Sequence, residues 1–150
     1  MASSLDRAYP SLAFRVDGPV RPLARPRVVR TKGWLDLEGL RKGVRVVRAY
    51  TPRSSVTYKN TLAWAARKEL GRRAWPKDRI YSVLITVSRP AAKRGDIDNI
   101  AKVVLDALKG TVYKDDGQVR HLEITLHDTG DGQYSWKESL SVTVCTLGDR

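Results

Sequence analysis

The chain has 150 residues, of which 41% are hydrophobic and 29% charged, a balance that excludes a disordered or fibrous protein. Its formal net charge is +12, and its single cysteine, Cys145, excludes an internal disulfide framework. Residues 1–16 lack the continuous apolar core of a signal peptide, and no segment approaches membrane-spanning length. We therefore expect one cytoplasmic domain covering residues 1–150.

In the first part of the chain the patterns predict two short strands separated by a basic loop. Residues 12–16 alternate apolar and polar side chains, which is typical of a half-buried strand. Residues 19–30 are rich in Pro and Arg and predict a loop or edge, because proline cannot donate to a hydrogen-bonded ladder. Residues 43–50 predict a short strand or one arm of a hairpin.

A helix and a central strand are expected next. Ser54 or Ser55 can cap a helix that runs to Arg73. Residues 79–89 carry β-branched and aromatic side chains on both alternating faces, which predicts a strand inside a sheet. The side chains available to pack from the helix are Val56, Leu62, Trp64, Ala65, Ala66 and Leu70.

The last third of the chain predicts a second helix and two strands. Apolar residues at helical spacing indicate a helix from Asp96, its N-cap, to Lys109, ending at Gly110. Two alternating segments follow, joined by residues 127–138 as a hairpin loop. The order predicts an α+β fold, a mixed β-sheet with helices packed on one face. The inward-facing strand residues are expected to be Leu122, Ile124, Leu126, Leu140, Val142 and Val144.

Charge is divided unevenly along the chain. Residues 1–95 hold 22 Lys and Arg against 6 Asp and Glu, whereas residues 96–150 hold 6 against 10. The bases are densest in the loop at residues 19–53. Such a segment attracts a polyanion, because each phosphate neutralised by Arg or Lys releases a condensed counterion. A merely solvated basic face is the alternative.

Acidic residues gather in the second helix and the turn after it. Asp96 and Asp98 fall in the first turn, where free amides and the helix dipole stabilise negative charge. Asp115 and Asp116 lie in a turn before the next strand, and the connecting chain is long enough to bring Asp116 back to the helix start. Three converging carboxylates need a compensating cation, and their oxygen ligands favour Mg²⁺.

Structural interpretations compete with this one. Simple helix capping explains Asp96 and Asp98 taken by themselves. Asp106, two turns along the helix, is expected to pair with Lys102. Two interpretations of Asp115 stay open: a supporting role beside the metal ligands, or an ordinary turn residue.

The string GDIDNIAKVVLDALKGTVYKDDGQV, within a catalytic segment at residues 94–119, resembles the signature of the RusA family of Holliday junction resolvases. These are small endonucleases common on phages and prophages. The family pattern is D-x-D-N, a lysine three residues later, an apolar helix with L/F-D-x-L, then D-D and a valine. Every element is present. The early strand, the loop PLARPRV and the YTP before the first helix match more loosely.

The resemblance implies a RusA-like, homodimeric, Mg²⁺-dependent endodeoxyribonuclease, with Mn²⁺ as an alternative metal. Such an enzyme nicks four-way DNA junctions at symmetric positions during recombination and repair. The resemblance implies these site residues: catalytic Asp96, Asp98, Asp116 and Lys102, the three acids as metal ligands, with Asp115 and Asn99 in support. Basic residues on flanking loops would grip the DNA backbone, namely Arg25, Arg27, Arg89, Lys93 and Arg94.

Two other functions stay open. One is a non-catalytic basic nucleic-acid-binding protein, in which the acids only cap and solvate a helix. The other is a nuclease that prefers flaps or forks, because junction selectivity depends on the spacing of two sites across a dimer. The basic segment at residues 34–48 has no assigned role, and neither a membrane nor a small-molecule substrate is expected.

Overall fold

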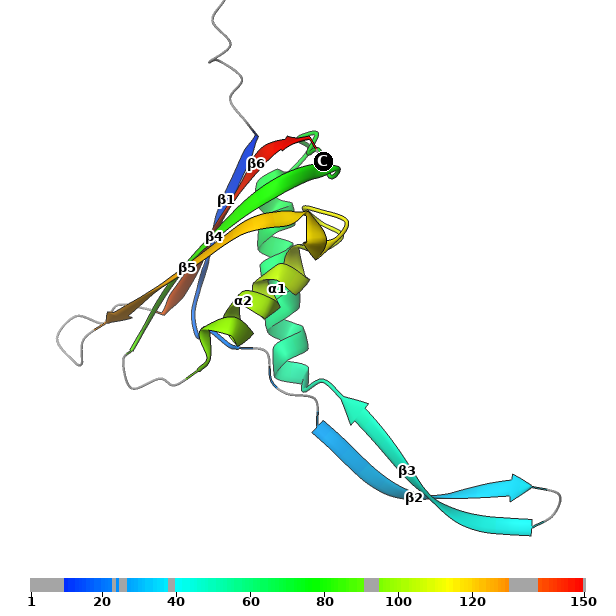
Figure 1. Ribbon diagram of the computed structural model, residues 1–150. Coiled ribbons are helices and arrows are strands. Elements are labelled where there is room, and N and C mark those ends of the chain that lie inside the picture. Colours follow the sequence, from blue (N-terminus) through cyan, green and yellow to red (C-terminus); the bar gives the residue numbers. More distant parts are fainter. Residues whose placement is uncertain are drawn as a thin grey trace, which may run out of the picture.

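The computed structural model describes residues 10–22, 24, 27–37, 40–90, 95–129 and 138–149. Figure 1 shows a sheet with two helices in front of it and a long two-stranded ribbon extending away from them. No described helix combines the length and apolar character needed to cross a membrane. The elements in chain order are β1 (Ser11–Asp17), β2 (Arg27–Leu37), β3 (Leu40–Tyr50), α1 (Arg53–Leu70), β4 (Arg79–Pro90), α2 (Ile97–Leu108), the 3-10 turn η1 (Asp116–Gln118), β5 (Val119–Thr129) and β6 (Ser139–Asp149).

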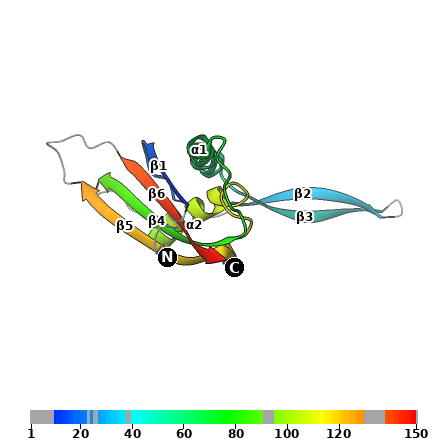
Figure 2. The ribbon, with the colours of Figure 1, turned by 90° about the horizontal axis from the view of Figure 1, so that it is seen from above.

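The main sheet has four strands in the order β1-β6-β4-β5. β4 pairs in parallel with β5 and antiparallel with β6, so the sheet is mixed and β4 is an inner strand, as predicted. Both helices pack on one face of this sheet (Figures 1 and 2). Alternate β4 residues Val83, Ile85 and Val87 are buried. The predicted α+β fold class is therefore confirmed.

The predicted hairpin between the last two strands is wrong. β4 lies between β5 and β6, so these two strands are not neighbours. The reason is that the chain crosses over through α2 between β4 and β5, so β5 pairs with one edge of β4 in parallel. β6 then pairs with the other edge of β4 in the antiparallel sense. Leu140, Val142 and Val144 of β6 are buried as expected. On the outer strand β5, Ile124 and Leu126 are half-buried and Leu122 is exposed.

β2 and β3 form a separate antiparallel ribbon that extends beyond the helices (Figures 1 and 2). Its register pairs Arg27 with Tyr50 at the base and Leu37 with Leu40 at the far end. Residues 43–50 form a hairpin arm, as predicted. Of the loop or edge predicted at residues 19–30, residues 27–30 form an edge, because they belong to β2 of a two-stranded sheet. The last proline of that segment precedes Arg27, so residues 27–30 all have the amide that a ladder requires.

Helix α1 begins and ends earlier than predicted. Its N-cap is Pro52, and Ser54 and Ser55 lie inside the first turn. Ser55 is therefore not a cap, and its hydroxyl instead accepts a hydrogen bond from the Ala24 amide at 3.1 Å. The helix ends at Leu70 because Gly71 adopts a positive φ of 54°. The predicted packing residues Leu62, Ala66 and Leu70 are buried and Ala65 is half-buried, whereas Val56 and Trp64 (61% exposed) face away from the buried side.

Helix α2 lies within one residue of its predicted bounds. Ile100, Ala101, Val104 and Leu108 are buried against the sheet and α1, which accounts for the helical spacing of apolar residues. Ile97 is an exception, with 43% of its surface exposed at the first turn. The helix therefore presents one apolar face to the core and one polar face to solvent.

Candidate active site

The N-terminal end of α2 carries two exposed carboxylates. Asp96 occupies the N-cap position, as predicted, but its side chain makes no capping hydrogen bond within the described chain. Its Oδ2 instead accepts a hydrogen bond from Nδ2 of Asn99 at 3.3 Å. Asp98 lies in the first helical turn. The free helix amides and the dipole stabilise both charges while leaving the carboxylates accessible.

The chain enters α2 through a tight contact at Gly95. Nη2 of Arg89 donates a hydrogen bond to the Gly95 carbonyl oxygen at 3.2 Å. A Cβ atom added to Gly95 would meet Arg89 Nη1 at 3.1 Å and Pro22 Cγ at 3.5 Å. The end of β4 and the segment after β1 therefore both fix the position where Asp96 begins the helix.

The C-terminal end of α2 carries a second acidic group, which is paired with a lysine. Nζ of Lys109 contacts Asp116 Oδ1 at 2.9 Å and Asp115 Oδ2 at 3.2 Å. The Gly117 amide, followed by Lys109, lowers the pKa of Asp115. The hydrogen bond from Lys109 is the largest cause that lowers the pKa of Asp116. The same two contacts raise the pKa of Lys109, so all three groups are charged near neutral pH.

Lys102 lies between these two acidic ends. It is exposed, one helical turn after Asp98. Its charge makes a smaller contribution, after Lys109, to lowering the pKa of Asp116. At 3.6 residues per turn, Asp98, Lys102 and Lys109 fall within about 40° of one another around the helix axis. The polar face of α2 therefore runs from the first acidic group, past Lys102, to the second.

The turn that carries Asp115 and Asp116 is held by a buried glutamine. Gln118 is 2% exposed, and its Oε1 accepts hydrogen bonds from the amides of Lys114 and Asp115, both at 2.9 Å. Its Nε2 donates to the carbonyl oxygens of Lys77 at 2.8 Å and Arg79 at 2.9 Å. All the hydrogen-bonding capacity of the amide is thus used to attach the acidic turn to the start of β4.

Further contacts anchor the loop between α2 and this turn. Trp75 Nε1 donates to the Val112 carbonyl at 2.8 Å, and Lys77 Nζ donates to that of Gly110 at 2.9 Å. The buried Tyr113 hydroxyl donates to the Leu105 carbonyl at 2.9 Å. Burial raises the pKa of Tyr113, and the charges of Asp116 and Asp106 raise it further. The C-terminal acidic group therefore has a defined position.

The predicted convergence of Asp96, Asp98 and Asp116 stays a prediction. Within the described ranges, no group of three or more His, Cys, Asp or Glu side chains is placed to hold a metal ion. The twelve residues of α2 span about 18 Å, which separates its two ends. The donor chemistry nevertheless fits a hard divalent cation, because the acids are exposed carboxylates and one pair already binds an ammonium group.

Other predicted residues have different positions. Asp106 is half-buried near Tyr113, and the described chain shows no ion pair between it and Lys102. Arg27 is exposed at the base of β2. The Arg89 guanidinium donates at least one of its hydrogen bonds to the Gly95 carbonyl. Arg25, Lys93 and Arg94 lie outside the described residues.

The sequence analysis missed two residues of this site. Lys109 pairs with both acids of the turn, and Gln118 holds the turn through a capping box with Asp115. The D-x-x-Q spacing of Asp115 and Gln118 is a capping-box signal that could have been found. The role of Lys109 had no such signal, because it depends on where the chain returns.

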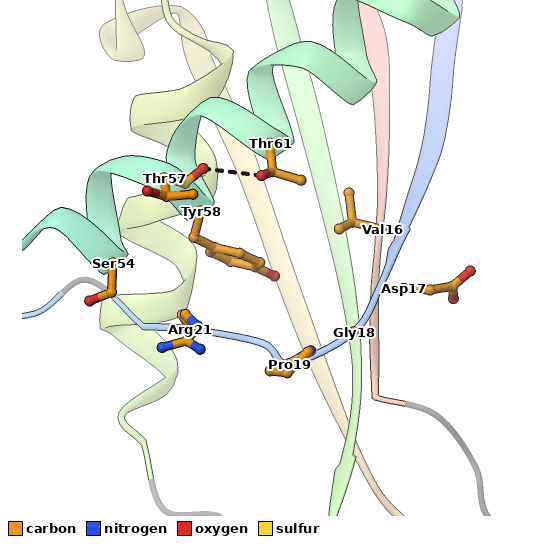
Figure 3. Close-up of a pocket in the computed structure, with 9 residues that line it drawn as sticks. All are labelled: Val16, Asp17, Gly18, Pro19, Arg21, Ser54, Thr57, Tyr58 and Thr61. Atoms are coloured by element: carbon orange, nitrogen blue, oxygen red, sulfur yellow. Dashed lines mark hydrogen bonds between the residues drawn. The ribbon is translucent and has the colours of Figure 1, made fainter.

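A cavity of about 350 Å³ lies elsewhere, between the end of β1 and the first turns of α1 (Figure 3). Its lining includes Asp17, Arg21, Ser54 and Tyr58. The Tyr58 hydroxyl is buried and has no hydrogen-bond partner within the described structure. Burial and the charge of Glu138 raise the pKa of Tyr58 to about 12. The cavity contains none of the predicted catalytic acids.

An α+β fold with exposed acids along one helix face of a strongly basic chain is compatible with an enzyme that acts on nucleic acid. The family described as endodeoxyribonuclease RusA matches residues 17–142, which is most of the chain. The protein belongs to this family and is an endodeoxyribonuclease. A search of curated proteins found no match.

Proposed function

We propose that this endodeoxyribonuclease resolves Holliday junctions by paired symmetric nicks, with Mg²⁺ bound by Asp96, Asp98 and Asp116. The observation that carries the proposal is the position of Lys102. It lies one turn from Asp98 and close enough to Asp116 to lower the pKa of that carboxyl. One exposed lysine therefore lies near acids from both ends of α2, which the resemblance to the family assigns to catalysis.

The residues of the site would divide the work as follows. A divalent metal, when bound, neutralises the attacked phosphate and lowers the pKa of a water molecule. Lys102 places a positive charge where the phosphate gains negative charge in the transition state. Asn99 restricts the carboxylate of Asp96 through its amide. Asp115, already fixed by the Gly117 amide, supports Asp116 from the neighbouring position.

Basic residues would hold the DNA on either side of these acids. The candidates are Arg25, Arg27, Arg89, Lys93 and Arg94. The basic segment at residues 21–53 supports this assignment to DNA binding. It has ten bases and two acids and includes the projecting β2–β3 ribbon (Figure 1). Each phosphate contact would contribute a salt-dependent and sequence-independent part of the affinity. The substrate would be branched DNA in the cytoplasm of a bacterial host, during recombination and repair.

Two symmetric nicks require two active sites, which we assign to a twofold homodimer. Sedimentation of the protein with an intact four-way junction should show two chains on each junction. A stable monomer bound to the junction would contradict symmetric resolution by one complex.

The test of the catalytic assignment is Asp98→Asn, assayed on a synthetic four-way junction with Mg²⁺. Cleavage should fall about a hundredfold or more, because the variant loses a charged metal ligand, while junction binding is kept. Asp106→Asn is the matched control, since it removes the same charge from the same helix outside the proposed ligand set. Normal cleavage by Asp98→Asn would show that the metal assignment is wrong.

Substrate preference requires a separate comparison. Wild-type protein should cut the four-way junction faster than a fork, a flap or a linear duplex of the same sequence. Faster cutting of the fork or flap would assign the enzyme to that substrate class instead. Mn²⁺ should replace Mg²⁺ in the same assay, because both are divalent ions that accept carboxylate ligands.

A further inference from the structure

The acidic turn after α2 is already paired with a positive charge of the protein itself, the ammonium group of Lys109. Lys109 Nζ lies 2.9 Å from Asp116 Oδ1 and 3.2 Å from Asp115 Oδ2. Adjacent carboxylates repel one another, so a positive charge between them stabilises the pair. The ammonium group therefore occupies the place where a metal ion bound to Asp116 would also place its charge.

The carboxylates do not depend on Lys109 for their position. Asp115 Oδ1 accepts the Gly117 amide at 2.8 Å, which leaves Oδ2 for the cation. Gln118 fastens the turn through hydrogen bonds to Lys77 and to Arg79, the first residue of β4, and Trp75 holds the preceding loop. An exposed ion pair adds little to folding stability, so the contact with Lys109 is not needed to form the turn.

Lys109 is the part of this arrangement that can move. Its side chain is about half exposed and carries its charge on a stem of four methylene groups. Its backbone stays in place through the bond from its amide to the Leu105 carbonyl, at 3.2 Å. The ammonium group can thus leave the two carboxylates while the helix end remains unchanged.

We propose that Lys109 acts as a resident counterion, and that a divalent metal must displace it from Asp115 and Asp116. This inference rests on the proposed function, since it assumes that Asp116 is a metal ligand. Lys109 offsets the repulsion between the two carboxylates in the metal-free protein. It also lowers the affinity for metal, because the incoming ion must replace an existing charged contact.

The experiment measures Mn²⁺ binding to the full-length protein without DNA, by titration calorimetry or by the electron paramagnetic resonance signal of free Mn²⁺. Lys109→Met removes the competing charge and keeps a side chain of similar length. We expect it to bind Mn²⁺ about fivefold or more tightly than wild type, from the loss of one nearby positive charge. Mn²⁺ should also raise its melting temperature by more than that of wild type.

Lys114→Met is the matched control, because it removes the same charge from the same loop. Its Nζ contacts Asp78 Oδ1 at 2.5 Å, away from the acidic pair. Its Mn²⁺ affinity should change less than about twofold. Lys109→Arg, which keeps the charge, should not bind more tightly than wild type. Both results would assign the effect to the Lys109 charge at this site.

Binding by wild type with no gain in Lys109→Met would overturn the inference and leave the proposed metal site intact. Weaker binding by Lys109→Met would also overturn it, because Lys109 would then support the metal rather than compete with it. Absence of Mn²⁺ binding by wild type and all three variants would overturn the proposed metal site itself. The two failures are therefore distinguishable.

Discussion

The two ends of α2 carry acids of the same kind, yet the protein holds them by different means. At the N-terminal end, the Asp96 side chain accepts one hydrogen bond from Asn99, and its backbone carbonyl accepts the Ile100 amide of the first helical turn. At the C-terminal end, Asp116 is paired with Lys109 and lies on a turn that Gln118 attaches to the first residue of β4. One end relies on the helix itself, and the other relies on tertiary contacts.

This difference shows how a basic chain keeps exposed acids in place before any metal is bound. A helix start tolerates negative charge because its amides and dipole oppose it. A turn beyond the helix end lacks that help, since the negative end of the dipole lies there, and the chain supplies a lysine instead. Lys102 lies between the two arrangements, and the proposed function assigns both to one site.

The largest expected effect tests whether the two ends form one site. Asp96→Asn and Asp116→Asn should each reduce junction cleavage about a hundredfold or more. The double variant should be little worse than either one, because residues that act as a unit give non-additive losses. Single-turnover cleavage rates with Mg²⁺ measure this. Losses that multiply in the double variant would mean that the two ends act independently.

Lys102→Met tests the link between the ends. We expect about a hundredfold lower cleavage rate at saturating junction, because the lysine would stabilise charge mainly in the transition state. The melting temperature should be nearly unchanged, since Lys102 is exposed. Lys59→Met, on the exposed side of α1, is the control of equal charge. A loss confined to junction affinity would instead make Lys102 a DNA-backbone contact.

Tyr113→Phe tests how firmly the C-terminal end is held. Losing the hydrogen bond to Leu105 should cost about 1 kcal/mol of unfolding free energy at neutral pH, measured by urea denaturation. Burial raises the pKa of Tyr113 above 10.0 in the folded protein. The unfolded chain ionises first as pH rises past 10.0, so this contribution to stability is present below that pH and lost above it.

The Tyr113→Phe variant should lose less stability than wild type when the pH is raised above 10.0. Tyr50→Phe is the control, because that side chain is exposed at the base of the ribbon. Equal alkaline losses in wild type and Tyr113→Phe would show that the tyrosine hydroxyl is not held in the folded loop.

Asn99→Ala should have the smallest effect. It removes one exposed contact to Asp96 at 3.3 Å, and cleavage should fall about fivefold or less. Asn60→Ala, an exposed change on α1, controls for the loss of a surface amide. A loss as large as that of Asp96→Asn would mean that Asn99 is itself part of the ligand set.

The sequence determined the elements whose signals are local. β1, β4 and α2 follow from alternation and helical spacing, because side chains repeat with the period of the backbone that carries them. The D-x-D-N motif with Lys102 and the later D-D pair led to the family that the match over residues 17–142 confirms. These features need only neighbours within a few residues, and they were correctly predicted.

Only the tertiary structure decided the arrangement between elements. The β5–β6 hairpin was a reasonable local prediction, but strand order depends on the crossover through α2. Trp64 is exposed because the neighbouring helices and strands cover the other side of α1. Lys109 meets Asp115 and Asp116 because Gln118, Trp75 and Tyr113 return the chain to the helix end. Contacts of this kind join residues through packing, and no periodicity along the chain encodes them.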